Sequence, residues 1–530
     1  MRPNSLRPSR PARAPRATAA ALAALAALAV LLALPAAAAP APAPAWNLTI
    51  FHTNDMHSAF WPRPAAWRDD GRPVGGVVAL SAHLAAERRS AAPDLLLDAG
   101  DFMTGNPVSR LREDGIPGAA VVRVLNALGY DAGAIGNHEF DLGHADLARL
   151  VARVRFPLLA ADLRLPDGGP AFRDEPLVLE RGGLRVGVLG VSCATMTNVV
   201  TPGRLGPVTL ADQAETVRAR AAALDPGTDL IVLLTHNGVQ GDRALARRLE
   251  GAGVDVIVGG HSHTRLTEPE VEAGIIIVQA GGNLTNLGRL DLRVEDDRVV
   301  AHAGRLVDLW ADDGTAPLAD PAVAALAARY GEQVQQEFGR VVGTLAQDLR
   351  RGRGETSIGN FLADALRLRA GADVGLINGG GIRKNLPAGP VTALDVHEVL
   401  PFGNALVTAS LTGVQLRTVV QTNADAAVGG DHGILQISGL AYVYRKAKQG
   451  PGAELVEITV GGQPLVPERV YTVAMPDFVA QMTGTYLGIG PVAFRDGGET
   501  VDEAVVAEFA RLGTVTAAIE GRIVRLEPQD

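Results

Sequence analysis

Five short clusters of acidic, histidine and asparagine side chains are spread between positions 54 and 263. They are Asn54-Asp55-Met56-His57, Asp98-Ala99-Gly100-Asp101, Gly136-Asn137-His138-Glu139-Phe140-Asp141, Thr235-His236-Asn237-Gly238 and Gly259-Gly260-His261-Ser262-His263. Carboxylate, imidazole and amide oxygen suit Mn²⁺, Zn²⁺, Fe²⁺ or Co²⁺, and the clusters contain no thiolate. Asp-x-His and His-x-His would place two donors on the same side of an extended segment. Two divalent ions carry more charge than Asp55 and Asp101 neutralise, which favours a bound hydroxide and an anionic substrate.

Each cluster follows a short apolar run or begins at its last residues. The apolar runs of this half of the chain include Leu48–Phe51, Leu95–Leu97, Val186–Val191, Leu230–Leu234, Val254–Val258 and Ile275–Val278. Such runs, separated by helix-like segments, predict an α/β fold with a sheet covered on both faces. Because loops after the carboxyl ends of the strands gather at one edge, the clusters are expected to converge there. One cluster alone is weak, but five in order at strand ends predict a metal site.

The stretch Ala311–Pro317 is typical of a domain boundary. A helix is predicted after it, with Asp320 as N-cap and Pro321 at its first position. The helix carries an apolar stripe at Val323, Leu326, Tyr330, Val334 and Phe338. We therefore predict a first domain over residues 47–315, a connecting helix over 316–340 and a second α/β domain over 341–527.

Composition excludes several classes of protein. With 530 residues and 47% hydrophobic residues, the chain can form at least two domains with sizeable cores. The formal net charge is −9 although the first 16 residues contain five arginines and no acid. So acidic a chain argues against wrapping nucleic acid or binding a membrane through a polybasic surface. The single cysteine, Cys193, excludes an internal disulfide and a cysteine-ligated zinc or iron–sulfur site, and we expect it to be buried.

The first 39 residues are typical of a secretory signal peptide. A basic head precedes an Ala/Leu run from Thr18 to Leu34 and the small residues of Ala36–Ala39. Residues 40–46, largely alternating Ala and Pro, predict an extended spacer. The alternative is an uncleaved anchor, because the run approaches the length of a membrane span. We expect an exported protein, periplasmic or extracellular, without a membrane span once the signal is cleaved.

The five clusters resemble the signature of calcineurin-like metallophosphoesterases, and with its second half the chain resembles secreted 5′-nucleotidases. The resemblance implies a four-layer α/β sandwich followed by a smaller α/β substrate-binding domain. It implies that Asp55, His57, Asp101 and His263 hold one divalent ion. Asp101 would bridge to a second ion that Asn137, His236 and His261 also hold. His138 resembles the family's catalytic histidine and Asp141 its orienting partner; the alternative for Asp141 is a cap on the following helix.

The second half contains motifs that by themselves are weak. One motif is either a plain turn or an anion-binding site: Asn378-Gly379-Gly380-Gly381-Ile382-Arg383. Two further motifs each contain a phenylalanine that by itself is more typical of a hydrophobic core: Pro401-Phe402-Gly403-Asn404 and Pro476-Asp477-Phe478. The resemblance implies that Arg383 binds phosphate-like oxygens and that Phe402 and Phe478 sandwich a base. Asn378 and Asn404 would contact the edge of the base or neighbouring groups. Stacking tolerates every base, which suits a broad nucleotidase.

The chain departs from the family pattern at two places. Family members place an Asp that binds the ribose hydroxyls where this chain has Gly484, so ribose selection is expected to be weak. The position of a phosphate-binding arginine is Gly352, with Arg351 and Arg353 on either side, and the sequence does not choose between them. Both changes should reduce the discrimination between substrates more than they reduce the rate of hydrolysis.

The sequence thus predicts an exported hydrolase with two divalent ions, Mn, Zn or Co, that converts nucleoside 5′-monophosphates to nucleoside and phosphate. The expected partner is a phosphorylated small molecule and not a nucleic-acid polymer. One alternative is a related hydrolase of UDP-sugars, 2′,3′-cyclic nucleotides or a sulfur-bearing ester. Another is a non-catalytic, metal-containing surface binding protein. Metal identity and oligomeric state stay open.

Overall fold

A computed structural model describes residues 46–65, 67–430 and 434–526. The chain from Trp46 onward forms one compact unit. The signal peptide and almost all of the spacer expected from the sequence lie outside the described residues. Within those residues, every helix is too short or too polar to cross a membrane. Cys193 is buried, as the sequence predicts.

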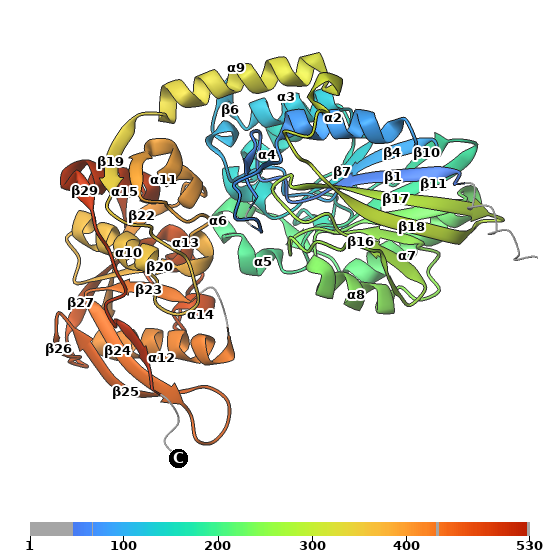
Figure 1. Cartoon of the computed structure of the whole chain (residues 1–530). Helices are drawn as coiled ribbons and strands as arrows, with labels where there is room; N and C mark the ends of the chain where they lie inside the picture. The colour runs from blue at the N-terminus through green and yellow to red at the C-terminus, as the bar shows by residue number, and fades with distance from the viewer. Residues whose placement is uncertain (1–45, 66, 431–433, 527–530) are drawn as a thin grey trace, which may run out of the picture. The chain divides into compact units, whose positions relative to one another are not determined.

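The N-terminal domain contains two six-stranded sheets (Figure 1), each with four consecutive parallel strands. The first sheet has the order β18 (Arg298–Asp308), β17 (Asn286–Glu295), β1 (Leu48–Thr53), β4 (Asp94–Asp98), β7 (Ala132–Ala134) and β8 (Leu158–Leu159). The second has the order β10 (Leu177–Arg181), β11 (Leu184–Gly190), β13 (Leu230–Leu234), β14 (Val256–Val258), β16 (Ile275–Val278) and β15 (Glu270–Glu272). The six apolar runs named above all overlap these strands, although Val191 lies just after β11 and Val254 just before β14.

The two sheets pack against each other, and helices cover their outer faces. Leu48 and Ile50 of β1 share a core with Leu230 and Val232 of β13, whereas the alternate Phe51 lies in the core on the helical side. The expectation that the apolar runs form a sheet covered on both faces is therefore confirmed, but for two sheets, since each strand buries one face on the other sheet and one under helices. The result is the four-layer α/β arrangement. The main outer helices are α2 (Val77–Arg88), α3 (Ala119–Leu128), α4 (His144–Val151), α7 (Gln213–Leu224) and α8 (Gly238–Arg248).

Helix α9 (Pro321–Phe338) follows the two sheets and leads into β19 as one uninterrupted helix (Figure 1). It begins as predicted, with the Asp320 side chain accepting from the backbone N–H groups of Ala322 and Val323. Val323, Tyr330 and Val334 are buried among the residues of the N-terminal domain core. The sequence bounds for the two domains and the connector stay predictions.

The C-terminal domain is a second α/β unit with two cores. Its five-stranded sheet has the order β23 (Leu435–Ser438), β20 (Val374–Asn378), β27 (Val470–Pro476), β22 (Ala405–Thr412) and β28 (Phe494–Thr500). Two smaller sheets consist of β21 (Gly389–Thr392), β19 (Val341–Leu345) and β29 (Thr514–Val515), and of β26 (Gln463–Pro464), β25 (Ala453–Val460), β24 (Leu440–Lys446) and β30 (Ile523–Arg525). The helices are α10 (Ser357–Ala370), α11 (Ala393–Val399), α12 (Gly413–Gly429), α13 (Asp477–Gln481), α14 (Thr483–Tyr486) and α15 (Val501–Leu512).

Short elements shape the loops between these strands and helices. They are β2 (Arg63–Pro64), β3 (Pro73–Val74), η1 (Pro107–Ser109), β5 (Arg112–Glu113), β6 (Ile116–Pro117), η2 (His138–Leu142), β9 (Leu163–Arg164), α5 (Met196–Val199), α6 (Pro202–Leu205), β12 (Thr209–Leu210), η3 (Asp225–Gly227), η4 (Ala316–Leu318) and η5 (Gly379–Gly381).

Candidate active site

The five clusters of polar residues come together at the carboxyl ends of strands from both sheets. Three of them end or follow β1, β4 and β7, and two follow β13 and β14. Their side chains form overlapping groups in which the possible ligand atoms lie within 4.8 Å of one another, namely Asp55–His57–His263, His57–Asp101–His138 and Asp101–His236–His261. The expected convergence is thus observed, although two sheets contribute to it rather than one.

The backbone that presents these side chains is not extended. Asp55, His57, Asp101, His261 and His263 all have positive φ values, between 49° and 75°. The idea that period-two alternation places the pairs Asp55/His57 and His261/His263 on one side of a strand is therefore wrong. Left-handed conformations are costly for residues with a Cβ, and they concentrate where the surrounding structure needs a particular side-chain direction.

A glycine allows the tight approach of two of the clusters. A Cβ on Gly260 would lie 2.7 Å from His236 Nδ1 and 2.8 Å from the carbonyl oxygen of Ala99. Any larger residue would push apart the segments that carry His236 and His261. This agrees with the expectation that the glycines beside the donors permit close backbone approach.

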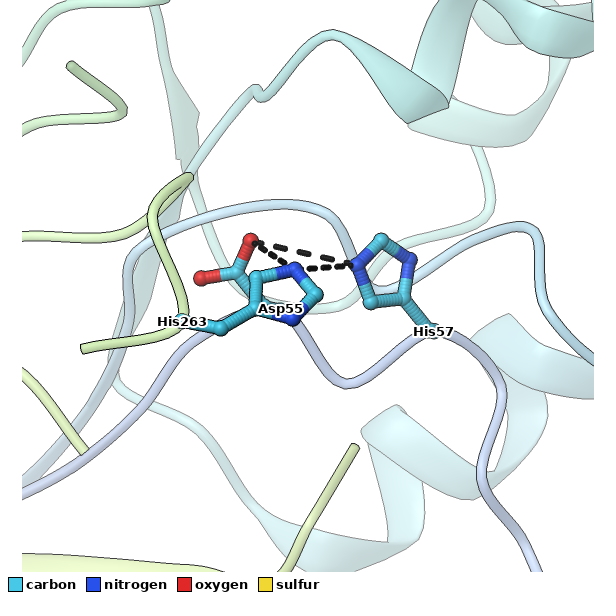
Figure 2. A group of neighbouring side chains, drawn as sticks. All are labelled: Asp55, His57 and His263. Atoms are coloured by element: carbon cyan, nitrogen blue, oxygen red, sulfur yellow. Dashed lines mark hydrogen bonds and ion pairs between the residues drawn. The ribbon is translucent and has the colours of Figure 1, made fainter. Parts of the chain in front are cut away.

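Asp55, His57 and His263 form the first group, and Figure 2 shows their ligand atoms facing one another. His57 Nδ1 lies 2.9 Å from the Thr104 carbonyl oxygen. A carbonyl only accepts, so Nδ1 bears the proton and Nε2 presents its lone pair. That Nε2 lies 2.9 Å from His263 Nε2, which is itself 3.3 Å from Asp55 Oδ1. Burial and the neighbouring His263 hold the pKa of His57 well below its ordinary value, so its ring is neutral.

Asp101, His236 and His261 form the second group. His236 Nδ1 donates to the Ala99 carbonyl oxygen at 2.7 Å, and its Nε2 lies 2.9 Å from Asp101 Oδ2. Although burial disfavours a charged ring, Asp101 and Asp55 hold the pKa of His236 well above its ordinary value, so this position attracts a cation. His261 Nδ1 lies 2.9 Å from Asn137 Oδ1, and burial lowers the pKa of His261 to about 4. Lone pairs of nitrogen and oxygen thus converge twice, and these donors fit two divalent ions.

His138 stands between the two groups and the C-terminal domain. Its Nδ1 lies 2.7 Å from Asp141 Oδ2, and its backbone N–H donates to Asp101 Oδ1 at 2.8 Å. Burial opposes a charged ring, but Asp101 and Asp141 hold the pKa of His138 above its ordinary value. The alternative interpretation of Asp141 as a helix cap is wrong, because α4 begins after Gly143 without a side-chain cap.

Two buried acids behind the site were not singled out from the sequence. Glu139 accepts from the backbone N–H groups of Asp101, Met103 and Gly136, and burial raises its pKa to about 8. Asp98 accepts from Thr53 Oγ1 and the Gly100 N–H, and burial raises its pKa to about 7. Both lie inside the clusters that the sequence marked, but only the hydrogen bonds show that they hold the backbone.

A cavity of about 1170 Å³ lies beside His138, and the candidate substrate-binding residues of the C-terminal domain line it. Asn378, Arg383, Phe402, Asn404 and Phe478 all line it. The two phenylalanines are half-buried rather than core residues. The Phe402 ring stacks on His138 with centroids 5.4 Å apart, and the Phe478 ring contacts Tyr486.

The cavity contains further basic residues, of which only Arg351 is a candidate from the sequence, with Arg353 as its alternative. Arg351 lines it, and its Nη1 donates to the Arg383 carbonyl oxygen at 3.1 Å. Arg63, Arg204 and Lys384 line it as well. Their positions depend on contacts between distant parts of the chain, so no local motif announces them.

The four-layer fold and the convergent donors define a metal-dependent phosphoesterase. Residues 48–265 match the calcineurin-like phosphoesterase family, and residues 341–487 match the 5′-nucleotidase C-terminal domain. The snake venom 5′-nucleotidase of Naja atra is 31% identical, covering 91% of this chain and 99% of its own. The 5′-nucleotidase precursor of Thermus thermophilus has a TM-score of 0.78 and 30% identity, covering 91% of this chain and 100% of its own.

Endonuclease YhcR of Bacillus subtilis is 27% identical over 92% of this chain, which spans only 42% of that longer protein. Together these similarities show that the chain belongs to the 5′-nucleotidase family of metal-dependent hydrolases.

Proposed function

We propose that this protein hydrolyses nucleoside 5′-monophosphates to nucleoside and phosphate. One observation carries the proposal: a single cavity of about 1170 Å³ is lined by donors of both groups and by the candidate base-binding residues. A cavity of this size accommodates a nucleotide. The phosphate would lie at the metal end and the base near Phe402 and Phe478.

The proposed ligands of the first divalent ion are Asp55, His57, Asp101 and His263. Those of the second are Asp101, Asn137, His236 and His261. Two such ions can activate a water molecule and bind both the entering and the leaving oxygen of a phosphoryl transfer. Mn, Zn and Co all suit this donor set.

His138 is the proposed catalytic histidine, with Asp141 as its positioning partner. The Asp141 carboxylate fixes the ring through Nδ1, which leaves Nε2 to donate a proton to a phosphoryl oxygen or the leaving group. Although burial opposes it, the carboxylates raise the pKa of His138 and so favour the protonated ring that this role needs.

Arg383 is the proposed phosphate-binding cation of the C-terminal domain, assisted by Arg351 rather than Arg353. Arg351 lines the cavity beside Arg383. Phe402 and Phe478 are the proposed stacking partners of the base, and Asn378 and Asn404 the polar contacts. The basic, apolar and small-residue pattern of residues 1–39 supports export to the periplasm or the cell exterior.

The test is phosphate release by the metal-loaded mature protein from AMP, 2′-deoxy-AMP, UDP-glucose and p-nitrophenyl phosphate. We expect rapid hydrolysis of AMP and little loss with the deoxy analogue. Activity confined to the aryl ester would contradict the nucleotide assignment while leaving the phosphoesterase chemistry intact. If the protein binds both ions but hydrolyses none of the four substrates, a more specialised hydrolase or the non-catalytic binding protein would be favoured.

The variant His138→Ala separates an enzyme from a binding protein. We expect kcat for AMP to fall about 10²–10⁴-fold while metal content by mass spectrometry is unchanged. His302→Ala is the matched control, because His302 is exposed on β18. If His138→Ala retains wild-type turnover, His138 has no catalytic role.

A nucleotide with a second anionic group is the second candidate substrate. Arg63 and Arg351 line the cavity in addition to Arg383, and these are more arginines than a monophosphate needs. Faster turnover of UDP-glucose than of AMP would favour this candidate.

A further inference from the structure

Arg204 of the short helix α6 reaches the loop that carries Phe402 and Asn404. Its Nη2 lies 3.1 Å from the Phe402 carbonyl oxygen, 3.4 Å from the Gly403 carbonyl oxygen and 3.2 Å from Asn404 Oδ1. The same guanidinium nitrogen thus contacts both carbonyl oxygens and the Asn404 side chain of this loop. One guanidinium from the N-terminal domain therefore fixes a loop of the C-terminal domain.

The contacts set the orientation of both side chains that the loop presents. An arginine only donates, so Asn404 must turn its Oδ1 to Arg204, which leaves its Nδ2 donor for another partner. The two bonded carbonyl groups flank the turn at Gly403, whose φ is +60°. Holding these carbonyl groups also fixes the Phe402 ring, which stacks on His138.

The same guanidinium approaches the proposed catalytic pair more loosely. Arg204 Nη1 lies 3.7 Å from Asp141 Oδ1, whereas Asp141 is bound to His138 at 2.7 Å. The His138–Asp141 hydrogen bond uses the other carboxylate oxygen and is the shorter of the two contacts. Loss of Arg204 should therefore release the loop that carries Phe402 and Asn404, and it should leave the His138–Asp141 pair in place.

We propose that Arg204 is a positioning residue that holds the Phe402–Asn404 loop over the metal end of the cavity, so that phosphate esters with a base are hydrolysed in preference to esters without one. This inference rests on the proposed nucleotidase function. The residue acts through Phe402 and Asn404 and need not touch the substrate itself.

The test compares AMP with ribose 5-phosphate, which has the same phosphate ester but no base. In Arg204→Met we expect the preference in kcat/KM for AMP to fall about tenfold, chiefly through a higher KM for AMP. The kinetics of ribose 5-phosphate should change less than about twofold. Arg204→Lys should restore part of the preference, because an ammonium nitrogen can donate to the same acceptors as Nη2 but lacks the planar geometry of the guanidinium.

Arg248→Met is the matched control, since Arg248 pairs on the surface with Asp212. It should keep the wild-type preference, and thermal unfolding checks that all variants are folded. An equal loss on both substrates, or an unchanged preference in Arg204→Met, overturns this inference alone. A wild-type protein that does not hydrolyse AMP overturns the proposed function, and this inference with it.

Discussion

The histidines of the site differ in charge because their neighbours differ. Burial and adjacent histidines keep His57 and His261 neutral, which is the state in which an imidazole binds a metal ion. His138 faces Asp101 and Asp141, which favour its charged form despite burial. Asp101 and Asp55 likewise raise the pKa of His236, so a carboxylate neighbour marks positions that attract positive charge, whether a proton or a metal ion.

Gly484 is the position at which we expect a single substitution to change substrate selection. It lies in α14, and a Cβ built there meets no atom within 4 Å, so a larger side chain fits. Gly484→Asp introduces a carboxylate that can accept from a ribose diol. We expect the preference for AMP over 2′-deoxy-AMP, measured as a ratio of kcat/KM, to rise about tenfold. Gly484→Ala is the control and should keep the wild-type ratio; an equally low ratio in both variants would mean that position 484 does not face the sugar.

At the level of helices and strands, local sequence patterns predicted where the strands lie but not which strands pair with each other. The apolar runs identified strands such as β13 and β16 at their observed bounds, because a buried parallel strand is apolar along its length. They could not show that these strands form two sheets, since a run reveals burial but not the partner strand. The left-handed backbone at Asp55 and His263 was equally hidden, because contacts from other segments impose it.

The start of α9 offers a test of a local signal that the structure confirms. Asp320 accepts from the N–H groups of Ala322 and Val323, at 2.7 Å and 3.2 Å. Asp320→Ala leaves both donors without this acceptor, and we expect the free energy of unfolding to fall by about 1 kcal/mol. Chemical denaturation followed by circular dichroism measures the change. Asp320→Asn keeps a capping oxygen and should stay close to wild type; an equal loss in both would show that the charge, not the cap, matters.

For the molecule as a whole, the contacts that hold the two domains together join residues that are far apart in the chain. Arg110 pairs with Asp502, and Asn106 Nδ2 donates to Glu398 Oε1 at 2.9 Å. The motifs located the candidate metal ligands, because each motif is contiguous and lies at a strand end. They could not locate Arg110 or Arg204, whose partners lie some 200 to 400 positions away and leave no local pattern. The cavity is therefore a property of the folded chain rather than of any motif.

The contact of Asp502 with Arg110 predicts a pH dependence of stability. Arg110 Nη1 donates to Asp502 Oδ2 at 2.9 Å, and His397 Nδ1 lies 3.3 Å from the same oxygen. Burial opposes the charged carboxylate, but His397 and Arg110 lower the pKa of Asp502 well below its ordinary value. A lowered carboxyl pKa stabilises the folded state above the ordinary pKa of about 4, and this contribution is lost as the pH falls below it.

Replacing Asp502 by Asn should therefore destabilise the protein only where the carboxylate is ionised in the unfolded chain. At pH 7 we expect Asp502→Asn to lower the free energy of unfolding by about 1–3 kcal/mol. The difference from wild type should shrink as the pH falls from about 5 toward 3, as urea denaturation at several pH values would show. Asp297→Asn is the control, because Asp297 is exposed in the turn between β17 and β18. A difference for Asp502→Asn that stays constant with pH would mean that lost packing, rather than lost charge, destabilises the variant.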